Sequence, residues 1–133
     1  MFKNFVIISW ALRVIAAVIL AQTLLFKFSG AEESKFIFST LGLEPVGRYG
    51  VGVAELVTVV LLLIPSTAGL GGLLGLGVIS GALMGHLTKL GIEVQGDGGL
   101  LFYLALAVFI CCAGIVLLHR EQLMQLVRLF FKK

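Results

Sequence analysis

Four polar residues lie inside long apolar stretches of this sequence: Arg13, Gln22, Glu55 and His86. At about 1.5 Å per helical residue, the last three of them fall roughly 7 to 10 Å from the same end of their apolar segments. An ionisable group at that depth in a membrane costs roughly 2.5 to 3.5 kcal/mol to insert, so it indicates a functional site that faces the bundle interior. Two interpretations stay open: a polar cluster that binds a ligand, or hydrogen-bonding groups that only join helices.

Arg13 and Glu55 are the only fully charged residues well inside the apolar segments, and we predict that they form an ion pair. Their estimated depths differ by about 8 Å, which two extended side chains can bridge. Gln22 or His86 then completes the hydrogen bonding of the carboxylate. In the rival arrangement Arg13 extends to the nearer headgroups and Glu55 is protonated.

The histidines and cysteines of the sequence do not indicate a metal site or a disulfide. The only histidines, His86 and His119, are expected near opposite membrane faces and therefore cannot share a haem or a metal ion. Cys111 and Cys112 are adjacent, so on a helix they point about 100° apart and favour neither a disulfide nor a structural zinc site. We predict that they pack as small buried hydrophobic residues and that the chain holds no metal.

Composition indicates that the surroundings are lipid. The 133 residues are 59% hydrophobic, with a mean hydropathy of +1.12, whereas ordinary globular domains are about 45 to 50% apolar. The net charge is +3, and the charges gather at the chain ends and in two loops. They form no nucleic-acid-binding surface, and no nucleic-acid partner is expected.

Four apolar segments are long enough to cross a bilayer, and they predict an all-α, four-transmembrane-helix bundle in a single domain, 1–133, with spans at about 5–26, 48–64, 67–90 and 100–118. The first segment exceeds the apolar core of a signal peptide and contains Arg13, so we expect it to be retained. Pro65 ends the second span in a tight antiparallel hairpin.

Two shorter segments are predicted to be amphipathic. In the first loop, 31–41 places Phe36, Ile37 and Leu41 at helical spacing after acidic residues, which suits a short surface helix. Residues 119–133 form a basic tail with its apolar residues on one side and its cations available to anionic headgroups. An ordinary solvated helical end explains this tail equally well. The apolar members are Leu123, Val127 and Phe130, and the cations are Arg120, Arg128, Lys132 and Lys133.

Glycines recur every fourth residue in the third span, as Gly71 and Gly75 and again as Gly77, Gly81 and Gly85. Each set lies along one stripe of a helix, where the backbone of a neighbour can approach closely. We predict that the second set packs against another helix.

Three charged residues are expected at the outer mouth of the bundle, where Lys27 ends the first span, Arg48 begins the second and Asp97 precedes the fourth. Asp97 is predicted to accept from the backbone N–H groups of Gly99 and Leu100, as a cap of the fourth helix. An alternative role is an ion pair with Arg48 or Lys89.

Positive charges near the spans indicate the orientation. The side with both termini carries one more Lys or Arg than the side with the first loop and the 90–99 hairpin, which favours both termini in the cytoplasm. The two sets are Lys3, Arg120, Arg128, Lys132 and Lys133 against Lys27, Lys35, Arg48 and Lys89.

Each of the four segments carries a short motif. The motifs are Phe26-Lys27-Phe28-Ser29-Gly30, Gly47-Arg48-Tyr49-Gly50 with Glu55 and Leu61-Leu62-Leu63-Ile64-Pro65, Ser80-Gly81-Ala82 with His86-Leu87-Thr88, and Asp97-Gly98-Gly99-Leu100-Leu101-Phe102. Together they resemble the DoxX family of small four-helix membrane proteins, and the resemblance extends over nearly the whole chain.

The resemblance implies a protein of the bacterial cytoplasmic (inner) membrane with a link to quinones and redox complexes. Two functional hypotheses follow. The first is an accessory subunit of a quinone-linked membrane oxidoreductase, in which an apolar groove holds the quinone and His86 or Glu55 contacts its oxygen. The second is a non-enzymatic assembly factor or small-solute carrier, in which the polar cluster has a structural role. The expected partners are the lipid bilayer and other subunits of a membrane complex, and a homo-oligomer is compatible with either hypothesis.

Overall fold

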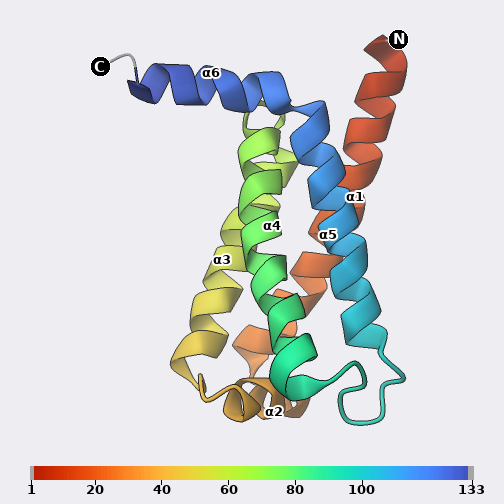
Figure 1. Cartoon of the computed structure of the whole chain (residues 1–133), viewed down its shortest axis with the longest axis vertical. Helices are drawn as coiled ribbons and strands as arrows, with labels where there is room; N and C mark the ends of the chain where they lie inside the picture. Colours follow the sequence, from red (N-terminus) through yellow and green to blue (C-terminus); the bar gives the residue numbers. More distant parts are fainter. Residues whose placement is uncertain (1, 132–133) are drawn as a thin grey trace.

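Four long apolar helices form the frame of the molecule in the computed structural model, which describes residues 2–131 (Figure 1). They are α1 (Phe2–Ser29), α3 (Val46–Leu63), α4 (Ala68–Gly85) and α5 (Leu100–Leu118). Each is long and apolar enough to cross a membrane, α4 together with its flanking turns over Pro65–Leu90. No strand occurs in the described range. The chain is therefore a multi-pass membrane protein built as a helical bundle.

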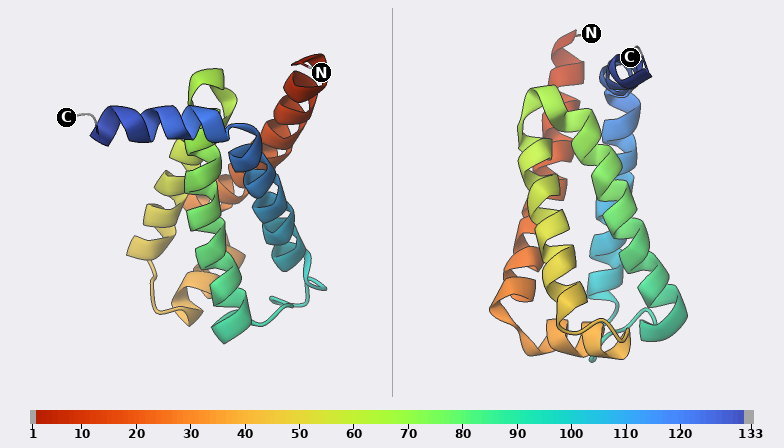
Figure 2. Two further views of the ribbon diagram at one scale, coloured as in Figure 1. Left: turned by 45° about the horizontal axis from the view of Figure 1, so that its top comes forward. Right: turned by 90° about the vertical axis from the view of Figure 1, so that its left-hand side faces the viewer.

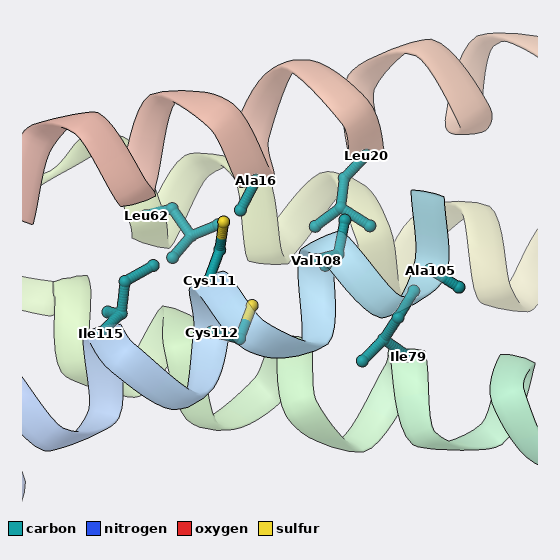
Figure 3. Packing of buried hydrophobic residues seen from close by; sticks show 9 residues of the cluster. All are labelled: Ala16, Leu20, Leu62, Ile79, Ala105, Val108, Cys111, Cys112 and Ile115. Atoms are coloured by element: carbon teal, nitrogen blue, oxygen red, sulfur yellow. The ribbon is translucent and has the colours of Figure 1, made fainter. Parts of the chain in front are cut away.

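The four helices pack in a ring, in which α1 contacts α3, α3 contacts α4, α4 contacts α5, and α5 returns to α1. Figure 3 shows the core between them, where side chains from all four helices meet. Cys111 and Cys112 are both buried in this core as free thiols, which confirms their predicted packing role. The rest of the cluster is Ala16, Leu20, Leu62, Ile79, Ala105, Val108 and Ile115.

The hairpin between α3 and α4 is a short 3₁₀ turn, η1 (Pro65–Thr67). Pro65 has no N–H, so the carbonyl of Leu61 loses its helical donor. The Thr67 hydroxyl replaces that donor at 2.9 Å. The next carbonyl, of Leu62, accepts from Nε of Arg13 at 2.6 Å. Side chains therefore satisfy the end of α3.

Close helix packing occurs in the first half of α4. A Cβ added at Gly71 would lie 2.8 Å from the backbone N of Leu62, and one at Gly75 would lie 2.6 Å from Sγ of Cys112. Only glycine lets α3 and α5 approach α4 this closely.

The second glycine set does not have the predicted role throughout. Gly77 and Gly81 are exposed, and a Cβ at either would meet nothing within 4 Å. Gly85 alone is buried, with Leu41 3.5 Å from the added Cβ. The prediction was wrong for Gly77 and Gly81 because they lie two and six residues after Gly75, which contacts both α3 and α5, and so they face outward from α4. Toward their end of the bundle α3 and α4 also diverge (Figure 2, right).

Helix α2 (Glu32–Thr40) crosses that wider end of the bundle (Figures 1 and 2). Its buried residues, Ser34 and Phe38, are four apart and share one face. Of the apolar residues predicted on one face, Ile37 and Leu41 are half-buried and Phe36 is exposed. The chain then returns through α3 and α4 to the π-helical turn η2 (His86–Leu90) beside α2.

Helix α6 (Arg120–Phe131) turns away from α5 at the opposite end of the bundle and runs across the start of α4 (Figure 1). Gln122 anchors it: Gly69 N–H donates to Oε1 at 2.7 Å, and Nε2 donates to the Pro65 carbonyl at 2.9 Å. Val127 and Phe130 are exposed. Lys132 and Lys133 of the predicted basic tail lie outside the described residues.

Candidate functional site

A cavity of about 280 Å³ lies at the α2 end of the bundle. Most of its lining is aliphatic or aromatic, and it comes from α1, α2, α3, α4, η2 and α5. Five polar side chains join the lining, namely Thr23, Lys27, Ser34, Glu55 and His86. An apolar cavity with a few convergent polar groups is the usual form of a small-molecule site.

Glu55 is the most buried ionisable group of the cavity, with 2% of its surface exposed. Nζ of Lys27 lies 2.6 Å from its Oε1 as an ion pair, and the Thr23 hydroxyl donates to Oε2. Oε1 is thus paired with the ammonium, and one of its two lone pairs is left over. The charge is compensated, but Oε1 can still accept from a ligand.

His86 lines the cavity from the turn η2. Its Nδ1 is 3.0 Å from the carbonyl of Gly91. Because a carbonyl only accepts, Nδ1 carries the hydrogen, which leaves Nε2 as an acceptor in the neutral ring. The ring also meets the edge of Phe102, with centroids 5.6 Å apart. A π-helical turn begins at His86, and such turns are frequent at functional sites.

Arg13 does not pair with Glu55, and our prediction of that ion pair was wrong. Arg13 is 2% exposed. Its Nε donates to the carbonyl of Leu62, and its guanidinium carbon lies 3.8 Å from the centroid of the Trp10 ring. A cation suits this place because the C-terminal end of a helix is the negative end of its dipole. Arg13 therefore belongs to the α3–α4 hairpin and not to the cavity.

Gln22 is exposed and does not line the cavity, so its predicted place in the polar cluster was also wrong. Its neighbour Thr23 takes that place, because one residue turns the side chain about 100° around the helix. Thr23 and Lys27 are four residues apart and lie on the same face of α1. That spacing was the signal in the sequence for the pair that reaches Glu55.

The three charged residues predicted at the outer mouth are all at this end of the bundle, with separate partners. Lys27 enters the cavity. Arg48 binds Glu44, with Nε 2.9 Å from each carboxylate oxygen, and also donates to the carbonyl of Lys27. Asp97 forms no ion pair within residues 2–131.

Asp97 instead binds backbone N–H groups at the start of α5. Oδ1 accepts from Val94 at 3.0 Å and from Gly99 at 2.8 Å, and Oδ2 accepts from Leu101 at 3.2 Å. The predicted cap is correct for Gly99, but its other donor is Leu101 and not Leu100. Burial alone would raise the pKa of this carboxyl, but the three N–H donors outweigh burial and lower it.

The other histidine, His119, lies at the far end of the molecule, between α5 and α6. Its Nε2 is hydrogen-bonded to the Ser9 hydroxyl at 2.7 Å, and its ring packs on Phe5. Burial and the nearby charge of Arg13 lower its pKa. Among residues 2–131, no three or more His, Cys, Asp or Glu side chains converge as metal ligands.

The fold and the cavity define a class: a small multi-pass helical bundle that encloses an apolar cavity with a buried ion pair at one end. No family model, curated protein or solved structure matches the chain. The likeness to the DoxX family therefore depends on the sequence motifs alone and stays a prediction.

Proposed function

We propose that this protein binds the ring of a quinone in the cavity beneath α2 and serves as an accessory subunit of a quinone-linked oxidoreductase complex. The proposed location is the bacterial cytoplasmic membrane, with both termini in the cytoplasm and the cavity near the outer face. The resemblance to the DoxX family and the balance of positive charges support this location.

The observation that carries the proposal is the buried pair of Lys27 and Glu55 in an apolar lining. An ammonium can donate to a quinone carbonyl, while Oε1 of Glu55 and Nε2 of His86 can accept from the hydroxyls of the reduced quinol. The aliphatic lining suits the ring itself. Both redox forms of one ligand thus find partners at the same site.

In this proposal the chain holds the ring and takes up its protons, and the redox group of a partner subunit takes its electrons. Glu55 and His86 are the two cavity groups that can receive a proton from a quinol hydroxyl.

The first experiment measures bound quinone and its effect on stability. Protein purified in detergent is extracted and analysed for stoichiometric quinone. Added quinone at about 100 times its dissociation constant should stabilise the fold by about 2.7 kcal/mol. Glu55→Gln and Lys27→Met should weaken this effect, whereas Gln22→Ala, an exposed change on α1, should not alter it.

Absence of quinone after repeated extractions, together with no change in unfolding on adding it, would reject the proposal. That result would favour the non-enzymatic role, in which Lys27 and Glu55 only join α1 to α3. The stability of the variants separates the two roles, because a purely structural pair changes stability equally with and without quinone.

A further inference from the structure

We infer that the cavity opens sideways to the bilayer between α3 and α4, and that its ligand is a single-chain amphiphile whose apolar chain leaves through this opening over Gly81 and Gly77. The inference rests on the proposed quinone site and adds the route and the chain to it.

The opening follows from residues that both line the cavity and face the outside. Gly81 and Ala82 are exposed members of the cavity lining. An added Cβ at Gly81 would meet no atom within 4 Å, so nothing from α3 covers that position. The cavity therefore reaches the surface within a membrane-spanning segment, where the surroundings are lipid chains.

Divergence of the two helices creates this opening. Val78 and Ala82 follow Gly71 by seven and eleven residues, which places all three on one face of α4. At Gly71 an added Cβ would lie 2.8 Å from the backbone of α3, yet Ala82 is exposed. The two helices separate along this stretch, as the right-hand view of Figure 2 shows.

Helix α2 covers much of the cavity at the end of the bundle. Ser34 and Phe38 of α2 are buried over the cavity, and Ile37, Leu41 and Leu43 complete its lining there. A ligand that is dissolved in the bilayer can reach the side between α3 and α4 without passing α2.

Volume and polarity decide the kind of ligand. A cavity of about 280 Å³ is at the lower end of ligand sites, which are about 300 to 1,000 Å³. It accommodates a ring but not a long chain in addition. The ion pair of Lys27 and Glu55, together with His86, gives this apolar cavity a polar region that suits a polar head. The exposed Gly77 and Gly81 leave a smooth surface for the chain one turn further along α4.

The test uses two benzoquinones in bilayer nanodiscs, one with only methyl groups on its ring and one with a decyl chain that ends in a photoreactive diazirine. In the wild type, the methylated ring should compete with the chain compound. Cross-links from the chain end should fall on α4 around Gly77 and on the facing side of α3.

Gly81→Phe is expected to fill the opening, reducing binding and cross-linking of the chain compound by about tenfold or more, with little change for the methylated ring. Leu117→Phe, an exposed change on α5 outside the cavity lining, is the matched control and should leave both probes unaffected.

The outcomes separate the two proposals. If the chain compound binds Gly81→Phe as it binds the wild type, or cross-links only to α1 and α5, the lateral opening is wrong while the quinone site stands. If Gly81→Phe binds neither probe because it misfolds, a lowered melting temperature will show this. Gly77→Phe then provides the same block one turn away. If neither probe binds the wild type, both proposals fail.

Discussion

Lys27 and Glu55 join α1 to α3 through a buried ion pair, and removing one partner leaves the other charge uncompensated. We expect Lys27→Met and Glu55→Gln each to destabilise the protein, in the range of about 3 to 5 kcal/mol found for broken buried pairs. The double mutant should recover part of the loss. Reversible unfolding of the three variants in mixed micelles measures this coupling.

Arg13, unlike Lys27, does not interact with Glu55, because its side chain donates to the carbonyl of Leu62. Arg13→Gln combined with Glu55→Gln should show losses that add to within about 0.5 kcal/mol, as for residues without shared partners. A strong coupling between these two substitutions would contradict the separate roles that the structure gives them.

The lowered pKa of Asp97 predicts how the free energy of unfolding depends on pH. Its ordinary pKa is 3.8, and the folded value is lower because N–H donors outweigh the burial of the carboxyl. The folded state therefore binds fewer protons near this pH. The contribution of Asp97 is complete above pH 3.8, declines as the pH falls through that value, and is absent below the lowered pKa.

Asp97→Asn should thus lower stability at neutral pH by about 0.5 to 2 kcal/mol, the usual cost of a lost helix cap. The loss should shrink as the pH approaches the folded pKa. Unfolding curves of the wild type and the variant at several acidic pH values test this, and parallel pH profiles would show that Asp97 does not act through its charge.

At the scale of elements, the two halves of α4 should respond oppositely to a single methyl group. Gly71→Ala places a Cβ against the backbone of α3, where no side chain can move aside, and should cost about 1 to 3 kcal/mol through overpacking. Gly77→Ala meets open space and should be neutral or stabilising by up to about 1 kcal/mol, since alanine favours helix.

Melting of both variants in the same detergent gives the comparison directly. Equal destabilisation by the two substitutions would mean that Gly77 is also a helix contact, against its place on the exposed face of α4. The pair is well matched because both are glycine-to-alanine changes within one helix.

For the whole molecule, both described ends lie on the side opposite to α2 and the 91–99 hairpin (Figure 1). We expect Gln95→Cys in the hairpin to react with a membrane-impermeant maleimide on intact cells. Gln125→Cys in α6 should react only after permeabilisation. The native thiols, Cys111 and Cys112, are buried and provide little background. The reverse labelling pattern would invert the proposed orientation.

The sequence by itself determined the four apolar helices, the tight hairpin at Pro65 and the burial of the two cysteines. These features depend on local hydropathy and on the missing N–H of proline, which neighbours do not change. The predicted span 100–118 coincides with α5. The sequence also indicated that Glu55 and His86 belong to one layer of the bundle, because depth follows from counting residues along a helix.

Only the tertiary structure decided which polar groups meet. Depth along a helix says nothing about rotation around it, so Thr23, and not Gln22, reaches Glu55. Lys27, predicted at the mouth, bends into the cavity and replaces Arg13 as the partner of Glu55. The role of each glycine likewise depends on which face of α4 is covered by α3 and α5 at its level, and that is set by contacts between segments far apart in the sequence.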